Sequence, residues 1–223
     1  MNRGVRGKAL YEHVMKVNVG VPLWLKVAYT GFMAILVPVY WYHYGPTNFL
    51  FFCDVALFLI LVGIWAEDPF LVSIATVGIL GSQSLWVLDF VAQLAGQSIT
   101  GMTAYMFEAQ RPLYLRGISL FHGWLPFLGL FLVWRLGYDR RAFWAWTLIA
   151  WVLILVCFFF IQGPSPERGI KPVNINYVHG FSAERPQDWM PARLWVVLEM
   201  VALPLLLYLP AHLFLRLPRF HRR

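Results

Sequence analysis

Four ionisable side chains lie inside long apolar segments, where a charge is costly and usually marks a functional site. They are Asp54, Asp89, His122 and Glu199, each on a different segment. Each lies about one to three helical turns from the same predicted surface of the membrane. We therefore expect Asp54, Asp89 and His122 to form one interacting group, in which a carboxylate supports His122 as a general base.

Cys53 adds a nucleophile candidate beside this group. A thiolate activated by an imidazole can carry an acyl group as a thioester, so Cys53 and His122 would suit acyl transfer. Adjacent residues on a helix point about 100° apart, so Cys53 and Asp54 cannot both face one partner squarely. The alternative is that Cys53 is a small apolar packing residue.

Other kinds of site would use the same side chains. Carboxylates and imidazoles are suitable ligands for a divalent ion, but none of these residues stands at a metal-ligand spacing, and no metal ligands are assigned. His43, His122 and His212 lack a shared depth and a convincing axial partner, which disfavours haem and leaves the cofactor unknown. The buried carboxylates would otherwise pair with Arg116 or His122, and so lock the helices together or carry protons.

Further polar residues are expected to line an outward-facing cavity and to bind substrate. Arg116 shares one helical stripe with His122. Asn174 and Asn176 alternate with apolar residues in a loop, where their amides would either cap the cavity or serve their own backbone, as in ordinary turns. Both interpretations stay open. With Glu199, these three residues make up the predicted substrate-binding set.

The composition of the chain is that of a membrane protein. Of its 223 residues, 60% are hydrophobic and 13% are Asp, Glu, Lys or Arg, whereas an ordinary soluble domain is roughly 25% charged. A soluble domain of this length leaves much of its surface in water and has no room to bury so many apolar side chains. The composition excludes a soluble enzyme, a disordered chain and a disulfide scaffold.

Six segments reach the roughly 20 apolar residues that cross a bilayer. They cover residues 22–42, 48–66, 70–94, 113–136, 142–162 and 194–215, with turn-forming residues between them. We therefore predict an all-α, polytopic membrane protein with six transmembrane helices in one bundle, covering 22–215. In the third segment Gln83, Trp86, Asp89 and Gln93 fall on one stripe, which should face the bundle.

The Lys and Arg residues predict the orientation. With six passes both termini share one side, and that side holds most of the 18 basic residues: Arg3, Arg6, Lys8, Lys16, Lys26, Arg135, Arg140, Arg141, Arg216, Arg219, Arg222 and Arg223. Residues 1–21 and 216–223 are therefore predicted to be cytoplasmic, in a plasma (inner) membrane, and loops 95–112 and 163–193 to be external. These basic residues would face anionic lipid headgroups, which explains the pI of 9.6 without nucleic acid.

The chain resembles an uncharacterised group of bacterial multi-pass membrane proteins over nearly its whole length, from Pro22 to Leu215. The resemblance rests on Tyr44-Gly45-Pro46-x-Asn48-Phe49-Leu50, Asp54, Tyr105-Met106-Phe107, Leu115-Arg116-x-x-Ser119-Leu120-Phe121-His122, Gly137-Tyr138-Asp139-Arg140-Arg141 and Asn174-x-Asn176-Tyr177. It implies a shared architecture and no particular activity.

Two short stretches resemble the androgen-induced membrane hydrolase family, six-pass lipid hydrolases with a Thr–His pair. Phe49-Leu50-Phe51-Phe52-Cys53-Asp54 is similar to the segment with the threonine, and His122-Gly123-Trp124-Leu125-Pro126 is similar to the histidine segment. Phe51 stands where the family has threonine, and Cys53 is two residues further on another face of the helix. Only His122 carries over as a catalytic residue.

These features predict a membrane-embedded hydrolase or acyltransferase acting on a lipid or other acyl substrate. His122 would be the general base, Asp54 or Asp89 its support, and Cys53 the nucleophile. The alternative is a non-enzymatic membrane subunit or small carrier, whose buried charges hold helices together or relay protons. The lipid bilayer and a lipid or acyl substrate are the expected partners.

Overall fold

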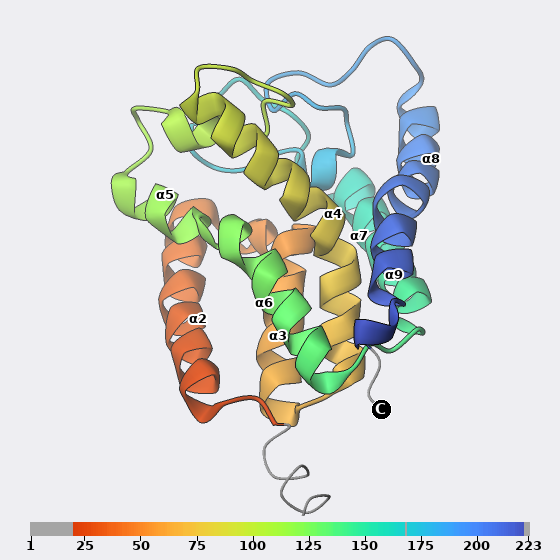
Figure 1. Ribbon diagram of the computed structural model, residues 1–223. Helices are drawn as coiled ribbons and strands as arrows, with labels where there is room; N and C mark the ends of the chain where they lie inside the picture. The colour runs from red at the N-terminus through yellow and green to blue at the C-terminus, as the bar shows by residue number, and fades with distance from the viewer. Residues whose placement is uncertain (1–19, 168, 221–223) are drawn as a thin grey trace, which may run out of the picture.

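A computed structural model describes residues 20–167 and 169–220 of the chain (Figure 1). Over these residues the regular secondary structure is helical, apart from one isolated bridge between Val178 and Gly180, and no strand is formed. The all-α prediction is confirmed. The predicted cytoplasmic segment 1–21 falls almost entirely outside the described residues, as does the end of the basic tail.

Five helical segments are long and apolar enough to cross a membrane. They are α2 (Leu23–Tyr44), α4 (Pro69–Leu94), α5 with α6 (Leu113–Ser119 and Phe121–Leu136), α7 (Ala142–Phe160), and α8 with α9 (Ala192–Leu203 and Leu209–Leu215). The chain is thus a multi-pass membrane protein. The remaining predicted span begins with a 3₁₀ turn, η1 (Pro46–Leu50), so its α-helix, α3 (Phe52–Ala66), has only 15 residues.

The ends of the helices sort into two groups (Figure 1). The start of α2 and the end of the described chain lie at one end of the molecule. The connections 95–112 and 163–193 lie together at the opposite end, above the ends of α4 and α7. The two long loops therefore share one side, and the two ends of the described chain share the other.

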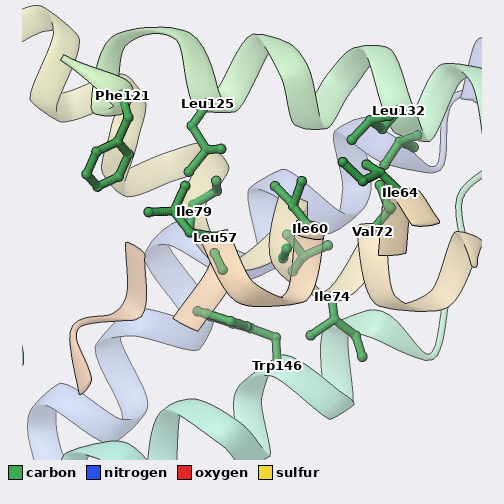
Figure 2. Close-up of a cluster of buried hydrophobic side chains, with 14 of the residues drawn as sticks. Leu57, Ile60, Ile64, Val72, Ile74, Ile79, Phe121, Leu125, Leu132 and Trp146 are labelled. Carbon is green, nitrogen blue, oxygen red and sulfur yellow. The ribbon is translucent and has the colours of Figure 1, made fainter. Parts of the chain in front are cut away.

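Helix α4 is the central element and contacts α3, α6, α7 and α9. Close approach to α7 depends on Gly78, because a Cβ atom at this position would overlap the indole ring of Trp146. Trp146 is fully buried and lies beside the aliphatic core, which includes Leu57, Ile60 and Ile79 (Figure 2). This packing turns the middle of α4 away from lipid and toward its neighbours.

The start of α4 is defined by Asp68 and Pro69. Asp68 Oδ1 accepts hydrogen bonds from the backbone N–H groups of Phe70 at 2.7 Å and Leu71 at 3.4 Å, which would otherwise lack partners. Pro69 occupies the first helical position, where its missing N–H costs nothing. The preceding residue, Glu67, adopts a left-handed conformation and ends α3. The sequence Glu67-Asp68-Pro69 therefore ends one helix and begins the next.

The last span changes its helical geometry at a proline. Pro204 begins a π-helical turn, η4 (Pro204–Tyr208), between α8 and α9. Because proline has no N–H, the carbonyl of Met200 loses its usual helical donor four residues later. Trp151 on α7 supplies the replacement, since its Nε1 donates a 2.7 Å hydrogen bond to the Met200 carbonyl. The carbonyl that Pro204 leaves unpaired in α8 thus forms a hydrogen bond between α8 and α7.

Candidate functional site

Asp89 is fully buried but does not contact His122. Its Oδ1 accepts hydrogen bonds from the backbone N–H groups of Ile99, Thr100 and Gly101 at 2.7–3.2 Å. Its Oδ2 accepts from the backbone N–H and the hydroxyl of Thr103 at 2.9 and 2.6 Å. With five donors around it, the carboxylate holds the loop that follows α4. The expected support of His122 by Asp89 is not formed.

His122, in the first turn of α6, is held by Gln83 of α4 instead. The distance between His122 Nδ1 and Gln83 Oε1 is 2.9 Å. A hydrogen bond to an amide oxygen requires the proton on Nδ1, which leaves Nε2 as the basic nitrogen. The Trp86 ring lies beside the imidazole, with 5.1 Å between ring centroids. The predicted stripe of α4 does face the bundle, because Gln83, Trp86 and Asp89 are all buried.

Asp54 is buried in the first turn of α3. Its Oδ2 accepts hydrogen bonds from Asn48 Nδ2 at 3.3 Å and from the Cys53 thiol at 3.7 Å. Its Oδ1 is buried and has no hydrogen-bond partner. Asp54, Asp89 and His122 therefore bind three separate sets of neighbours. None of the hydrogen bonds in the described residues joins them directly, because a shared depth in the membrane does not fix the direction in which each side chain points. That they form one interacting group through water stays a prediction.

Cys53 is the second residue of α3, and Asn176 fixes the start of this helix. Asn176 Oδ1 accepts a 3.0 Å hydrogen bond from the backbone N–H of Phe52, and its Nδ2 donates to the Leu50 carbonyl at 2.9 Å. The next N–H groups in this first turn, those of Cys53 and Asp54, have no carbonyl within the helix to bind. The thiol thus lies at a helix end whose N–H groups favour negative charge.

The asparagines are not free to bind a ligand. Asn174 Nδ2 donates to the carbonyls of Gly180 and Ser182, and its Oδ1 accepts from the His179 N–H, so it serves its own loop. Asn176 serves α3 and η1 as described. Both residues, and Tyr177 after them, adopt positive φ values, which are uncommon for residues other than glycine and are found where surrounding structure imposes them. The loop is thereby fastened to the bundle next to Cys53.

Two tyrosines from the long loops come close to Cys53. Tyr177 is 38% exposed, and the thiol of Cys53 and the carboxylate of Asp89 act electrostatically on its hydroxyl to raise its pKa. Burial raises the pKa of Tyr105, whose hydroxyl interacts with Trp86, Cys53 and Ser119. Tyr105 therefore interacts both with Cys53 and with the Trp86 ring that flanks His122. Neither tyrosine lies in an apolar span with an ionisable residue, so neither was expected in the site.

Basic residues lie at the same end of the molecule. Arg111 is buried, donates to the Tyr44 hydroxyl at 2.6 Å and pairs with Glu108 at 3.3 Å. Arg116 donates to the Met106 carbonyl at 3.3 Å, and its Nε is buried without a hydrogen-bond partner. Arg116 makes no ion pair with any residue in the described part of the chain. Arg111 Nε is likewise buried without a hydrogen-bond partner, so Arg116 differs from Arg111 in having no carboxylate beside it among the described residues.

Glu199 lies on α8 and is the most isolated of the predicted residues. Its Oε2 is buried and has no hydrogen-bond partner. None of the hydrogen bonds or ion pairs in the described ranges joins it to Asp54, Asp89 or His122. The structure gives no contact that places Glu199 in the same site.

The side chains that could bind a metal ion are also spread apart. Among residues 20–167 and 169–220, no three His, Cys, Asp or Glu side chains lie close enough together to hold a metal ion. His43 and His212, which the sequence places at other depths, contact Tyr114 and Tyr138 respectively. The candidate residues form two groups, Cys53 with Asp54 and His122 with Gln83.

The chain matches no protein-family model, no curated protein and no solved structure. Its function must be inferred from its own residues.

Proposed function

We propose that the protein is a membrane-embedded hydrolase or acyltransferase acting on an acyl ester of a lipid or related substrate. The observation that carries this proposal is the hydrogen bond between His122 Nδ1 and Gln83 Oε1, which orients the imidazole and leaves Nε2 free as a base. Cys53 supplies a nucleophile at the first turn of α3. Tyr105 interacts with Cys53 and with Trp86, which contacts His122, and a substrate carbonyl would meet both groups beside Tyr105.

In the proposed reaction the Cys53 sulfur attacks the acyl carbonyl carbon, and the thiol proton passes to His122 Nε2. The carbonyl oxygen gains the negative charge, which the N–H groups of Cys53 and Asp54 stabilise. The C–O bond to the leaving alcohol then breaks, and the alcohol takes the proton from His122. Water or a second alcohol attacks the thioester in the same way and releases the acyl group and the thiol.

Two features of the sequence and structure support this choice. The segment that carries His122 and the segment that carries Cys53 are those that resemble the androgen-induced membrane hydrolase family. Arg116, near the outer loops, has a buried Nε without a partner and would bind an anionic headgroup or carboxylate. We propose that the side with the long loops is external, so that substrate reaches the site from the outer leaflet.

Turnover and acyl-enzyme formation test the proposal. Purified protein in nanodiscs would be incubated with a radiolabelled long-chain acyl ester, and Cys53 would be examined by mass spectrometry for a hydroxylamine-sensitive acyl adduct. We expect Cys53→Ala to abolish the adduct and His122→Ala to slow its formation roughly 10²–10⁴-fold, the usual contribution of a general base. Gln83→Leu should lower the rate while leaving the folded protein intact, because it only releases the imidazole.

Cys157→Ala is the matched control. Cys157 is the second free cysteine, is buried on α7, and lies 3.7 Å from Asn176 Nδ2. This variant should form the adduct at the normal rate. An adduct on Cys157, or turnover that is unchanged in Cys53→Ala, would overturn the nucleophile assignment.

A second function is favoured by one observation. Asp54 Oδ1 and Glu199 Oε2 are both buried without hydrogen-bond partners, and such a carboxyl group avoids the cost of a buried charge by binding a proton. We propose proton binding within a carrier or membrane subunit as the alternative. Proteoliposomes with an entrapped pH dye distinguish the two, since a relay predicts a proton flux that Asp54→Asn removes and that Cys53→Ala leaves unchanged.

A further inference from the structure

A groove of about 270 Å³ runs between α4 and α6 on the outside of the bundle. Helix α4 contributes Leu80, Ser84, Val87 and Leu88, and helix α6 contributes Pro126, Phe127 and Leu130. Both helices belong to segments that are long and apolar enough to cross a membrane. The groove therefore opens toward the hydrocarbon of the bilayer.

The lining has the chemistry of a site for a hydrocarbon chain. Ser84 is its one polar residue, and the Ser84 hydroxyl donates a 2.6 Å hydrogen bond to the Leu80 carbonyl of its own helix. The groove thus offers no side-chain donor or acceptor that needs a partner from a ligand. Leu88 and Phe127 are 58% and 65% exposed and form its open edges. In a bilayer, an acyl chain can occupy such a surface without leaving any polar group without a hydrogen-bond partner.

The groove borders the polar site along both helices. Ser84 follows Gln83 directly, and Pro126 lies one turn after His122 on α6. The hydrogen bond between Gln83 and His122 therefore joins the two helices about one turn from the residues that line the groove.

We propose that this groove binds the acyl chain of the substrate and that the chain enters the site laterally between α4 and α6. This inference rests on the proposed function, because it assigns a binding position to the hydrocarbon chain of the proposed acyl substrate. The size fits one chain, since pockets that enclose whole drug-sized ligands measure roughly 300–1,000 Å³. A headgroup or leaving alcohol would then lie on the loop side, beyond His122.

Photocrosslinking in nanodiscs tests the groove without relying on turnover. The probe is a phosphatidylcholine with a diazirine on one acyl chain, and labelled positions are mapped by peptide mass spectrometry. We expect labelling of residues 80–88 and 126–130 to exceed, by several-fold, labelling of the exposed lipid-facing residues Leu148 and Leu155 on α7. Equal labelling of both faces would show that ordinary boundary lipid fills the groove and would overturn the proposal.

Matched variants sharpen this test. Ser84→Phe fills the groove, Ser84→Ala leaves it open, and Val91→Phe adds the same ring to a 59% exposed position on α4 outside the lining. Only Ser84→Phe should remove the enriched labelling and raise the KM for long-chain esters relative to short-chain esters. Loss of labelling in Val91→Phe as well would contradict a specific site.

The two proposals fail separately. Enriched labelling that Ser84→Phe removes, in a protein without esterase or transferase activity, would reject the enzyme and keep the groove as a lipid site. Activity that depends on Cys53 and His122, with uniform labelling and unchanged chain-length preference in Ser84→Phe, would keep the enzyme and reject the groove.

Discussion

The side chain of Asn176 binds the backbone on both sides of Phe51, although 124 residues separate it from Phe52 in sequence. Its oxygen accepts from the Phe52 N–H, and its nitrogen donates to the Leu50 carbonyl. One amide group thus satisfies the donor that begins α3 and the carbonyl that ends η1. Cys53 follows Phe52 directly, so its position depends on this contact.

Asn176→Ala should destabilise the protein by about 2–4 kcal/mol, because it leaves two buried backbone groups without partners. Asn176→Gly removes the same hydrogen bonds but tolerates the positive φ of 59°. We expect it to be about 1 kcal/mol less harmful than alanine, since left-handed backbone strains residues with a Cβ. Thermal unfolding in detergent measures both. Equal stability of wild type and both variants would show that the contact contributes nothing.

Asp89 should act on the loop that follows α4 and have little direct part in chemistry. Asp89→Leu removes the acceptor for five donors and should cost about 3–5 kcal/mol, as deletion of one partner of a buried charged group does. Hydrogen exchange should accelerate at residues 99–103. Val91→Ala, on the exposed face of the same helix, is the control and should leave exchange unchanged. Normal protection of the loop in Asp89→Leu would contradict this role.

The contact between Trp151 and Met200 should depend on Pro204. Trp151→Phe removes the indole donor and should cost about 1 kcal/mol, typical of a hydrogen bond between membrane helices. In a Pro204→Ala background the Met200 carbonyl regains a helical donor, so the same change should cost less. A double-mutant cycle measures the coupling. Additive effects would mean that the proline does not create the need for Trp151.

Loop 163–193 should become less stable at mildly acidic pH. Burial lowers the pKa of His179 below its usual value, so the folded loop favours the neutral imidazole. The Phe158 ring, 5.3 Å away between centroids, offers no charge to offset protonation. The stability that His179 contributes is therefore complete above about pH 6.5, the value in an unfolded chain, and declines as pH falls from there toward the lowered pKa of the folded state.

Limited proteolysis of the loop between pH 7.5 and pH 5 checks this expectation. Cleavage within residues 163–193 should increase as the pH falls, and His179→Phe should abolish the increase because phenylalanine does not titrate. A pH dependence that persists in His179→Phe would assign the effect to another group.

Hydropathy and turn residues were sufficient to place the helices. Apolar runs ended by Gly45-Pro46, Asp68-Pro69 and Gly137 produced boundaries within a few residues of those observed. The shortening of α3 was missed because apolar residues such as Phe49 and Leu50 fit a 3₁₀ turn as well as a helix. The π-helical turn at Pro204 was also missed, because a proline within an apolar span does not specify how the helix continues after it.

The site was harder to predict for a physical reason. Sequence gives the depth of a side chain in its helix but not the rotation of one helix against the next, so Asp89 and His122 were grouped although they face different neighbours. The partners of Asp89 are mostly backbone N–H groups, which every sequence provides and no residue type signals. Gln83 could be recognised as a residue that faces the bundle, because it lies on the polar stripe of its helix. Its pairing with His122 was not predicted.

The central place of α4 has a consequence for how the protein is made. Synthesis proceeds from the N-terminus, so residues 69–94 enter the membrane before residues 113–136 and 142–160 exist. Until then Gln83 lacks its partner His122 on α6, and the space beside Gly78 lacks the Trp146 indole of α7. The Asp89 carboxylate has no partner until residues 99–103 follow. The span with the largest buried share is therefore made before the helices that cover its polar stripe, and this stripe needs other polar partners until they follow.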